Sequence, residues 1–383
     1  MNSTNRITVV DSLRGFAVCG IIMIHFMEHM NFYSFPEQAP FNQNVWDAVW
    51  FLGSSKMYAI FALLFGFSCY IQHHNQEIKG YDFRLRFAWR MLLLLGWGMI
   101  DLMFYNGDIL GTYAAMGLLM IPLVKAPSKL LKGIAIFLFL QPVEITYAIL
   151  GLINPSIHPL DTGTGQFWGP LYHACGNGSI FDVAKAGVTY GLQVNFGWAI
   201  ENGRLTQTLM LFIIGFLLGR NGRFLDTEEN TRFWKRVLIT SIVAFAVFFP
   251  LWKIIPGCIE NKPVSASIET LLYQWRNFAM TCFYVSGVTL LFYRTKAQKA
   301  LFHLSYIGKM SLSDYLIQSI VGGFLFYNWG LHLFDKCNHT VSVLMAVGFL
   351  VLLYFFCRWW TTHHRRGPLE EIWNRLTWIG GKR

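Results

Sequence analysis

The chain contains about ten apolar stretches, each close to the length that a helix needs to cross a membrane, which is about 20 residues. Only 14% of the 383 residues are charged and 54% are hydrophobic, whereas about a quarter of a soluble protein is charged. The sequence therefore predicts an all-α fold, a polytopic membrane helix bundle with about ten transmembrane helices. The stretches are 12–30, 48–72, 86–105, 108–124, 130–153, 205–220, 237–255, 268–293, 311–333 and 341–361.

The segments between these stretches are too short for a separate soluble domain, so we expect one membrane domain over 1–383. The longest connection, 154–204, is rich in Gly, Pro and polar residues, and within it 183–200 reads as an amphipathic or re-entrant segment. Residues 368–378 carry apolar side chains on one helical face, which predicts a short helix lying on the membrane surface. The first apolar run is longer than that of a cleavable signal, so we expect it to be retained.

Most of the 31 Lys and Arg residues fall in alternate loops and in the C-terminal tail. Basic residues near spans concentrate on the cytoplasmic side. This asymmetry predicts that both termini are cytoplasmic and that loop 154–204 faces outward. It also explains the net charge of +10 without nucleic acid as a partner.

The seven cysteines have no metal-ligand spacing, and we expect no metal site. Cys175, Cys258 and Cys337 fall in connecting loops, so a disulfide among them is left open. The sequence contains no phosphate-binding loop, nucleophile elbow or dinucleotide fingerprint.

The first span, "DSLRGFAVCGIIMIHF" at 11–26, carries ionisable residues that are costly in lipid. Helical geometry puts Arg14 and His25 on one face, roughly 16 Å apart along the axis. Glu28 follows on nearly the same face and could orient the imidazole for acid–base chemistry or simply mark the helix end. The plainer alternatives are that Arg14 pairs with Asp11 at the membrane surface and that His25 is a neutral core residue.

An Arg followed after ten residues by a His resembles the signature of the membrane acyltransferases that O-acetylate bacterial surface glycans, and "LRGFA" is similar to that superfamily too. More of the chain resembles one branch, the YeiB-like family of bacterial membrane proteins. Many members of that branch carry Asn where His25 stands. The matching pieces are "DSLRGFAVCGI", "SKMYAIFALLFG", "GDILGTYAAMGL", "LFIIGFLLGRNGRF", "IGKMSLSDYLIQS" and "RRGPLEEIWNRLTW".

The resemblance implies an acyltransferase of the bacterial inner membrane that moves an acetyl or acyl group from cytoplasmic acyl-CoA to an acceptor at the outer face. His25 would act as general base or carry the acyl group, with Glu28 and Asp108 beside it. Arg14 suits the phosphates of CoA, because guanidinium groups bind phosphate in a bidentate manner. Arg84, Arg86 and Arg90 are further candidates, although such residues are more often topological charges. Acyl-CoA is expected as a co-substrate, with no permanently bound cofactor.

Four other polar residues lie in or beside the spans. Asp108 is either part of the catalytic group or a cap of the following helix. Lys56 and Arg276 are candidates for substrate binding, and for each the alternative is a structural role within the bundle. Asp314 could bind substrate, cap its helix or pair with Arg14.

Two other functions remain open at this point. A transporter of a small or anionic solute would also line its path with intramembrane charges. A scaffold for a partner protein would bury Arg14 and His25 in contacts with no accessible volume. Expected partners of the acyltransferase are the bilayer, acyl-CoA and a glycan, lipid-linked sugar or small-molecule acceptor, with a homo-oligomer left open.

Overall fold

A computed structural model describes residues 7–31, 39–334 and 336–380, and every regular element in those ranges is helical. The helices are α1 (Thr8–Asn31), α2 (Pro40–Gly53), α3 (Met57–Glu77), α4 (Arg84–Leu102), α5 (Leu110–Met120), α6 (Ser128–Phe139), α7 (Pro142–Ile153), α8 (Gly165–Asn177), α9 (Ile180–Glu201), α10 (Arg204–Arg220), α11 (Glu228–Ile254), α12 (Lys262–Arg294), α13 (Gln298–Gly308), α14 (Ser311–Phe326), α15 (His339–His363) and α16 (Pro368–Thr377), with a 3₁₀ turn at Pro256–Cys258.

The all-helical prediction is confirmed, and each predicted apolar stretch overlaps one helix or two consecutive helices. The predicted number of ten transmembrane helices is not confirmed. Among the described residues, four helical segments are long and apolar enough to cross a membrane, or five if the bent pair α6–α7 counts as one span. The segment at 183–200 forms a regular helix, α9, which α8 precedes within the long connection.

The ends of several helices follow from local sequence. Thr227 and Asn338 accept hydrogen bonds from the backbone amides of Asn230 and Val341, which caps α11 and α15. Ser179 and Asp182 form a reciprocal capping box at the start of α9. These caps satisfy amide groups that have no partner within the helix.

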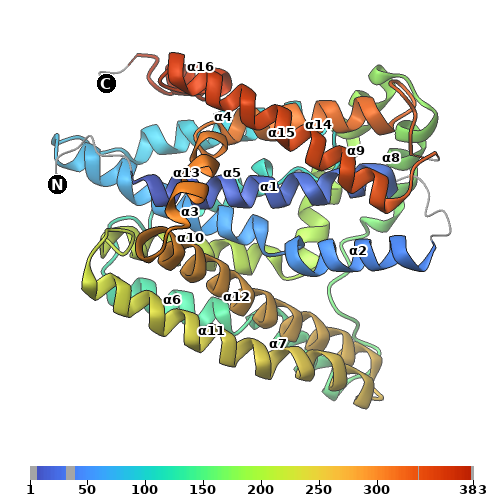
Figure 1. Ribbon diagram of the computed structural model, residues 1–383. Helices are drawn as coiled ribbons and strands as arrows, with labels where there is room; N and C mark the ends of the chain where they lie inside the picture. Colours follow the sequence, from blue (N-terminus) through green and yellow to red (C-terminus); the bar gives the residue numbers. More distant parts are fainter. Residues whose placement is uncertain (1–6, 32–38, 335, 381–383) are drawn as a thin grey trace.

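The helices surround α1 in layers (Figure 1). The layer formed by α6, α7, α11 and α12 lies on one side, and α4, α14, α15 and α16 lie on the other. Helix α1 itself packs against α3, α13, α14 and α15. The ionisable residues of α1 therefore face protein on several sides.

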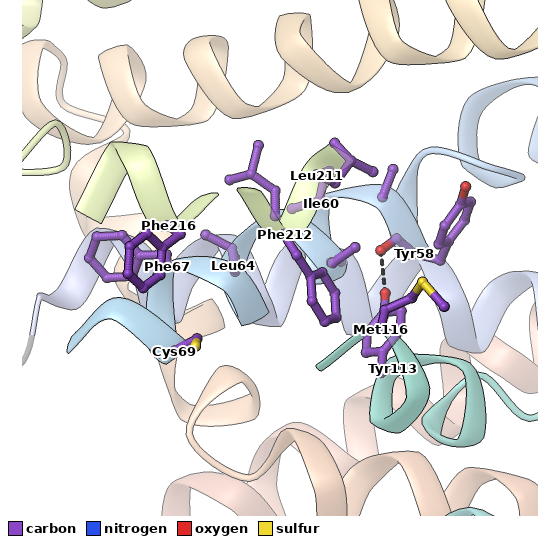
Figure 2. Packing of buried hydrophobic residues seen from close by; sticks show 14 of the residues in the cluster. Tyr58, Ile60, Leu64, Phe67, Cys69, Tyr113, Met116, Leu211, Phe212 and Phe216 are labelled. Carbon is purple, nitrogen blue, oxygen red and sulfur yellow. Dashed lines mark hydrogen bonds between the residues drawn. The ribbon is translucent and has the colours of Figure 1, made fainter. Parts of the chain in front are cut away.

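Helices α3, α5 and α10 pack through a large apolar cluster (Figure 2). Phe212 of α10 stacks on Phe65 and meets Tyr113 of α5 edge to face, and the Tyr113 hydroxyl donates to the carbonyl of Tyr58 at 2.6 Å. A Cβ at Gly215 would lie 1.8 Å from the Leu63 carbonyl oxygen. Helices α3 and α10 can therefore approach this closely only because Gly215 has no side chain.

Helices α1 and α13 make a second close contact. A Cβ on Gly15 would lie 1.9 Å from the carbonyl oxygen of Leu304, and a Cβ on Gly308 would lie 1.9 Å from that of Asp11. Because each glycine faces the backbone of the other helix, neither helix can move aside without losing the contact. This pair fixes the Arg14 end of α1 beside the start of α14.

Helix α16 docks on the same end of the bundle as Arg14. Its Glu370 carboxylate accepts hydrogen bonds from the amides of Leu312 and Ser313, at 2.7 and 3.2 Å, and from the Ser313 hydroxyl. Trp373 lies under the guanidinium of Arg90, 3.6 Å from the ring centroid. Burial raises the pKa of Glu370, and the bonds from Ser313 oppose that rise. The helix predicted at 368–378 is thus present, and it caps α14.

We expect Gly15→Ala to destabilise the bundle by about 1–3 kcal/mol, because the new methyl group overlaps the Leu304 backbone. Thermal unfolding of the detergent-solubilised protein measures this. Gly287→Ala in α12 is the matched control, since a Cβ there has no atom within 4 Å. Equal melting temperatures for the two variants would contradict the close contact.

Replacing Glu370 with Ala should raise hydrogen exchange at the first turn of α14 and in α16, because loss of a helix cap costs about 0.5–2 kcal/mol. Glu371→Ala is the control, because Glu371 pairs only with Arg366 and Arg375 within α16 and the turn before it. Exchange at α14 should not change in this control. An unchanged α14 in Glu370→Ala would refute the capping role.

Candidate functional site

Two cavities lie along α1, one at each end of the line from Arg14 to His25. The first, which we call the Arg14 cavity, has a volume of about 300 Å³, and the second, the His25 cavity, about 440 Å³. Ile21, Ile109 and Tyr315 line both. The two spaces therefore lie back to back, with these three side chains between them.

Arg14 is held by two partners at the wall of its cavity. One guanidinium nitrogen donates to Asp11 at 2.9 Å, and another donates to the Ser68 hydroxyl of α3 at 2.5 Å. The pairing with Asp11 is the one that the plainer interpretation of the sequence predicted. It does not remove Arg14 from the cavity, which the side chain still lines.

The Arg14 cavity is strongly basic. Arg90, Lys309 and Arg366 join Arg14 in its wall, and the carboxylate in the wall is Glu370. The Glu370 oxygens are already engaged by the start of α14. Within the described part of the chain, neither Arg90 nor Lys309 has a carboxylate within ion-pair distance. The cavity therefore has positive charge that its own side chains do not neutralise.

The structure separates the three arginines at the start of α4. Arg90 lines the Arg14 cavity. Arg84 pairs with Asp82 at 2.7 Å, and hydrogen bonds from Arg84 lower the pKa of that carboxyl. Arg86 donates to the carbonyl oxygens of Thr377 and Ile379. Arg84 and Arg86 thus contact a loop and the C-terminal segment, and neither lines the cavity.

His25 lines the second cavity and is fixed by aromatic neighbours and one amide. Its ring lies 4.5 Å from the Tyr105 ring and 5.7 Å, edge to face, from that of Tyr315. Its Nδ1 is 2.6 Å from the amide nitrogen of Gln318 in α14. The orienting partner that we expected, Glu28, instead accepts a hydrogen bond from the Tyr105 hydroxyl.

Glu28 and Asp108 both line the His25 cavity. Asp108 accepts hydrogen bonds from the amides of Leu110 and Gly111, each at 2.9 Å. The capping alternative for Asp108 is therefore the arrangement observed, and it leaves the carboxylate at the cavity wall.

The three candidates for substrate binding lie outside the cavity linings. Lys56 is buried and its ammonium donates to the carbonyl of Phe51 at 2.7 Å. Arg276 is buried over the rings of Trp252 and Tyr273. Asp314 is buried 3.3 Å from the sulfur of Cys357, whereas Arg14 pairs with Asp11. No disulfide joins cysteines in the described ranges.

Sequence reasoning missed part of the site. Lys309, Arg366 and Trp373 enter the Arg14 cavity from the second half of the chain. Arg204 enters the His25 cavity from the start of α10. A signal for Arg204 was available, because it is one of the few basic residues outside the basic set of loops. Lys309, Arg366 and Trp373 lie in two of the segments that resemble the YeiB-like family, but no local pattern connected them with Arg14.

Comparison with known proteins divides the chain into two matched parts. Residues 6–156 match the family model described as "Heparan-alpha-glucosaminide N-acetyltransferase, catalytic". Residues 218–380 match "Protein of unknown function (DUF418)". Arg14, His25 and Asp108 lie in the first part, and Lys309 and Tyr315 in the second. Each cavity is therefore built from both matched parts.

The chain is also similar over nearly its full length to curated bacterial proteins. It is 26% identical to "Uncharacterized protein YxaH" of Bacillus subtilis, over 98% of this chain and 95% of that protein. It is 26% identical to "Uncharacterized protein YeiB" of Escherichia coli, over 97% of this chain and 96% of that protein. These matches agree with the resemblance of the sequence to the YeiB-like family, and the first matched part is similar to an acetyltransferase catalytic domain.

Proposed function

We propose that the protein transfers an acetyl or other small acyl group from acyl-CoA in the Arg14 cavity to an acceptor in the His25 cavity. One observation carries the proposal: the basic cavity and the histidine cavity share the wall formed by Ile21, Ile109 and Tyr315. The match to an acetyltransferase catalytic domain over 6–156 supports the same chemistry. The donor would enter from the cytoplasm, and the acceptor would be a glycan, lipid-linked sugar or small molecule.

The basic cavity suits the phosphates of CoA. Arginine and lysine side chains form charge-assisted hydrogen bonds with phosphate oxygens. Arg90 has a rigid position over Trp373, so its guanidinium is already oriented. The thioester would reach toward Tyr315 and the shared wall, which must open for the reacting groups to meet.

His25 would take the proton from the acceptor hydroxyl or amine as that atom attacks the thioester carbonyl. The new ester or amide bond forms, the carbon–sulfur bond breaks, and the thiolate of CoA receives the proton from the imidazolium. This role needs a proton on Nδ1 and a lone pair on Nε2. Rotating the Gln318 amide by 180° presents its oxygen to Nδ1, and that oxygen is otherwise buried without a partner.

The competing functions make different demands on the same site. A scaffold requires no accessible volume at Arg14 and His25, but both residues line cavities. A transporter would use both cavities with no covalent step. The acyltransferase is favoured because a match to an acetyltransferase catalytic domain accompanies the histidine.

Arg90→Gln should weaken acetyl-CoA binding about tenfold or more, because a hydrogen bond to a charged group contributes roughly 1.5–3 kcal/mol. Titration calorimetry of the protein in nanodiscs measures this affinity. Arg84→Gln, which changes the same residue type outside the cavity, should bind like wild type. Absence of acetyl-CoA binding to wild type, or equal losses in both variants, would exclude the proposed donor site.

His25→Gln should slow acetyl-CoA turnover about a hundredfold or more, since a positioned general base contributes about 10²–10⁴. Donor affinity should be retained, because His25 lines the other cavity. Thiol release and mass spectrometry of products follow the reaction, and His158→Gln is the control at an exposed histidine. Solute flux without any acyl donor, with no product that gains an acetyl group, would favour the transporter.

A further inference from the structure

Three basic residues, Arg204, Lys56 and Arg276, gather where α2 ends and α3 begins, and of these Arg204 lines the His25 cavity. Lys56 lies within electrostatic range of both Arg204 and Arg276. The residues come from three separate places in the chain, the α2–α3 break, the start of α10 and the middle of α12. Helix packing, and not proximity in the sequence, therefore brings the three residues together.

Two aromatic rings and one hydroxyl group hold the Arg204 side chain at the cavity wall. Its guanidinium lies between the rings of Tyr58 and Trp198, 4.4 and 4.2 Å from their centroids. One nitrogen donates to the Ser55 hydroxyl at 3.1 Å. Stacking on two rings holds the planar group while leaving its edge for hydrogen bonding.

A hydrogen-bonded chain joins Arg204 to the buried part of the cluster. The Ser55 hydroxyl lies 3.0 Å from the Tyr273 hydroxyl, and the guanidinium of Arg276 lies 4.8 Å from the Tyr273 ring. Ser55 has a φ of 65°, which turns the backbone sharply between α2 and α3 and brings its side chain to this position.

Among the described residues the cluster makes no direct ion pair, although Glu28 and Asp108 line the same cavity as Arg204. Within the described ranges, none of the three basic side chains has an acidic group within ion-pair distance. Glu28 is close enough to Arg204 to interact electrostatically, but the hydrogen bond that its carboxylate accepts comes from the Tyr105 hydroxyl. Buried charges normally occur paired, because an unpaired one is costly.

Unused hydrogen-bond donors surround Arg276. Arg276 is 4% exposed and its Nε has no acceptor. The amide nitrogen of the adjacent Asn277 and the indole nitrogen of Trp252, whose ring lies 4.0 Å from the Arg276 guanidinium, also lack acceptors. The Arg276 guanidinium donates to the Asn277 side-chain oxygen at 3.3 Å, and the unused donors around it leave hydrogen-bonding capacity beside the positive charge of Arg276.

We propose that Arg204, Lys56 and Arg276 form an anion-binding subsite of the His25 cavity, which takes a phosphate or carboxylate group carried by the acceptor. That the anion belongs to the acyl acceptor rests on the proposed function. That the cluster binds an anion does not depend on it. The anion contacts Arg204 at the cavity wall, and Lys56 and Arg276 supply the positive potential behind it. A neutral acceptor would leave these charges unpaired and bind more weakly.

The test uses full-length protein in phosphatidylcholine nanodiscs with two probes, inorganic phosphate and geranyl phosphate, each compared with its neutral analogue, glycerol and geraniol. Binding is followed by titration calorimetry and by tryptophan fluorescence, since Trp198 and Trp252 contact the arginines. We expect phosphate-bearing probes to bind and neutral analogues not to bind. Preference for inorganic phosphate indicates a soluble acceptor, and preference for geranyl phosphate a lipid-linked one, and either supports the subsite.

Saturating CoA separates this site from the Arg14 cavity. With CoA present, Arg204→Gln and Arg276→Gln should each weaken probe binding about tenfold or more, whereas Arg204→Lys should retain most of it and Arg90→Gln should leave it unchanged. No binding of either probe, or equal binding by wild type and both Gln variants, would overturn the subsite. Loss of acetyl-CoA binding with probe binding intact would instead reject the proposed donor site alone.

Discussion

An ionisable side chain withdrawn from water needs a partner or a polar cavity, and this requirement organises the bundle around α1. Arg14 meets Asp11 and Ser68, and His25 meets Gln318. Asp11 lies in α1 itself, whereas Ser68 and Gln318 come from α3 and α14, which are far apart in the chain and both pack on α1. The polar positions of one helix therefore determine which other helices must lie beside it, and the glycine contact with α13 holds that arrangement in place.

The carboxylates and the cations of the site have different roles. Glu370 and Asp108 bind the amides at the starts of α14 and α5, so their negative charge is used to complement helix termini. The basic side chains of the Arg14 cavity and of the cluster at Arg204 are left with fewer counter-charges. The Arg14 cavity is therefore basic, whereas the His25 cavity on the other side of the Tyr315 wall combines Arg204 with the carboxylates of Glu28 and Asp108.

Much of the helical structure could be predicted, because it depends on local properties. Apolar runs of nearly membrane-spanning length predicted the helices, although their length alone did not decide which helices cross the membrane. Helical periodicity put Arg14 and His25 on one face, and both line cavities along α1. The cap at Asp108 and the helical structure of α16 could also be predicted, since each depends on residues within one or two turns.

Other parts of the site could not be predicted, because they depend on contacts between distant segments. Arg84, Arg86 and Arg90 are equivalent in sequence, and only the docking of α16 leaves Arg90 at the cavity while Arg86 binds the C-terminal carbonyls. The partner of His25 is Gln318, nearly 300 residues away, and no local pattern connects them. The sequence by itself determined a helical membrane protein with an Arg–His face. Only the tertiary structure decided which side chains share a cavity, because helix packing selects them.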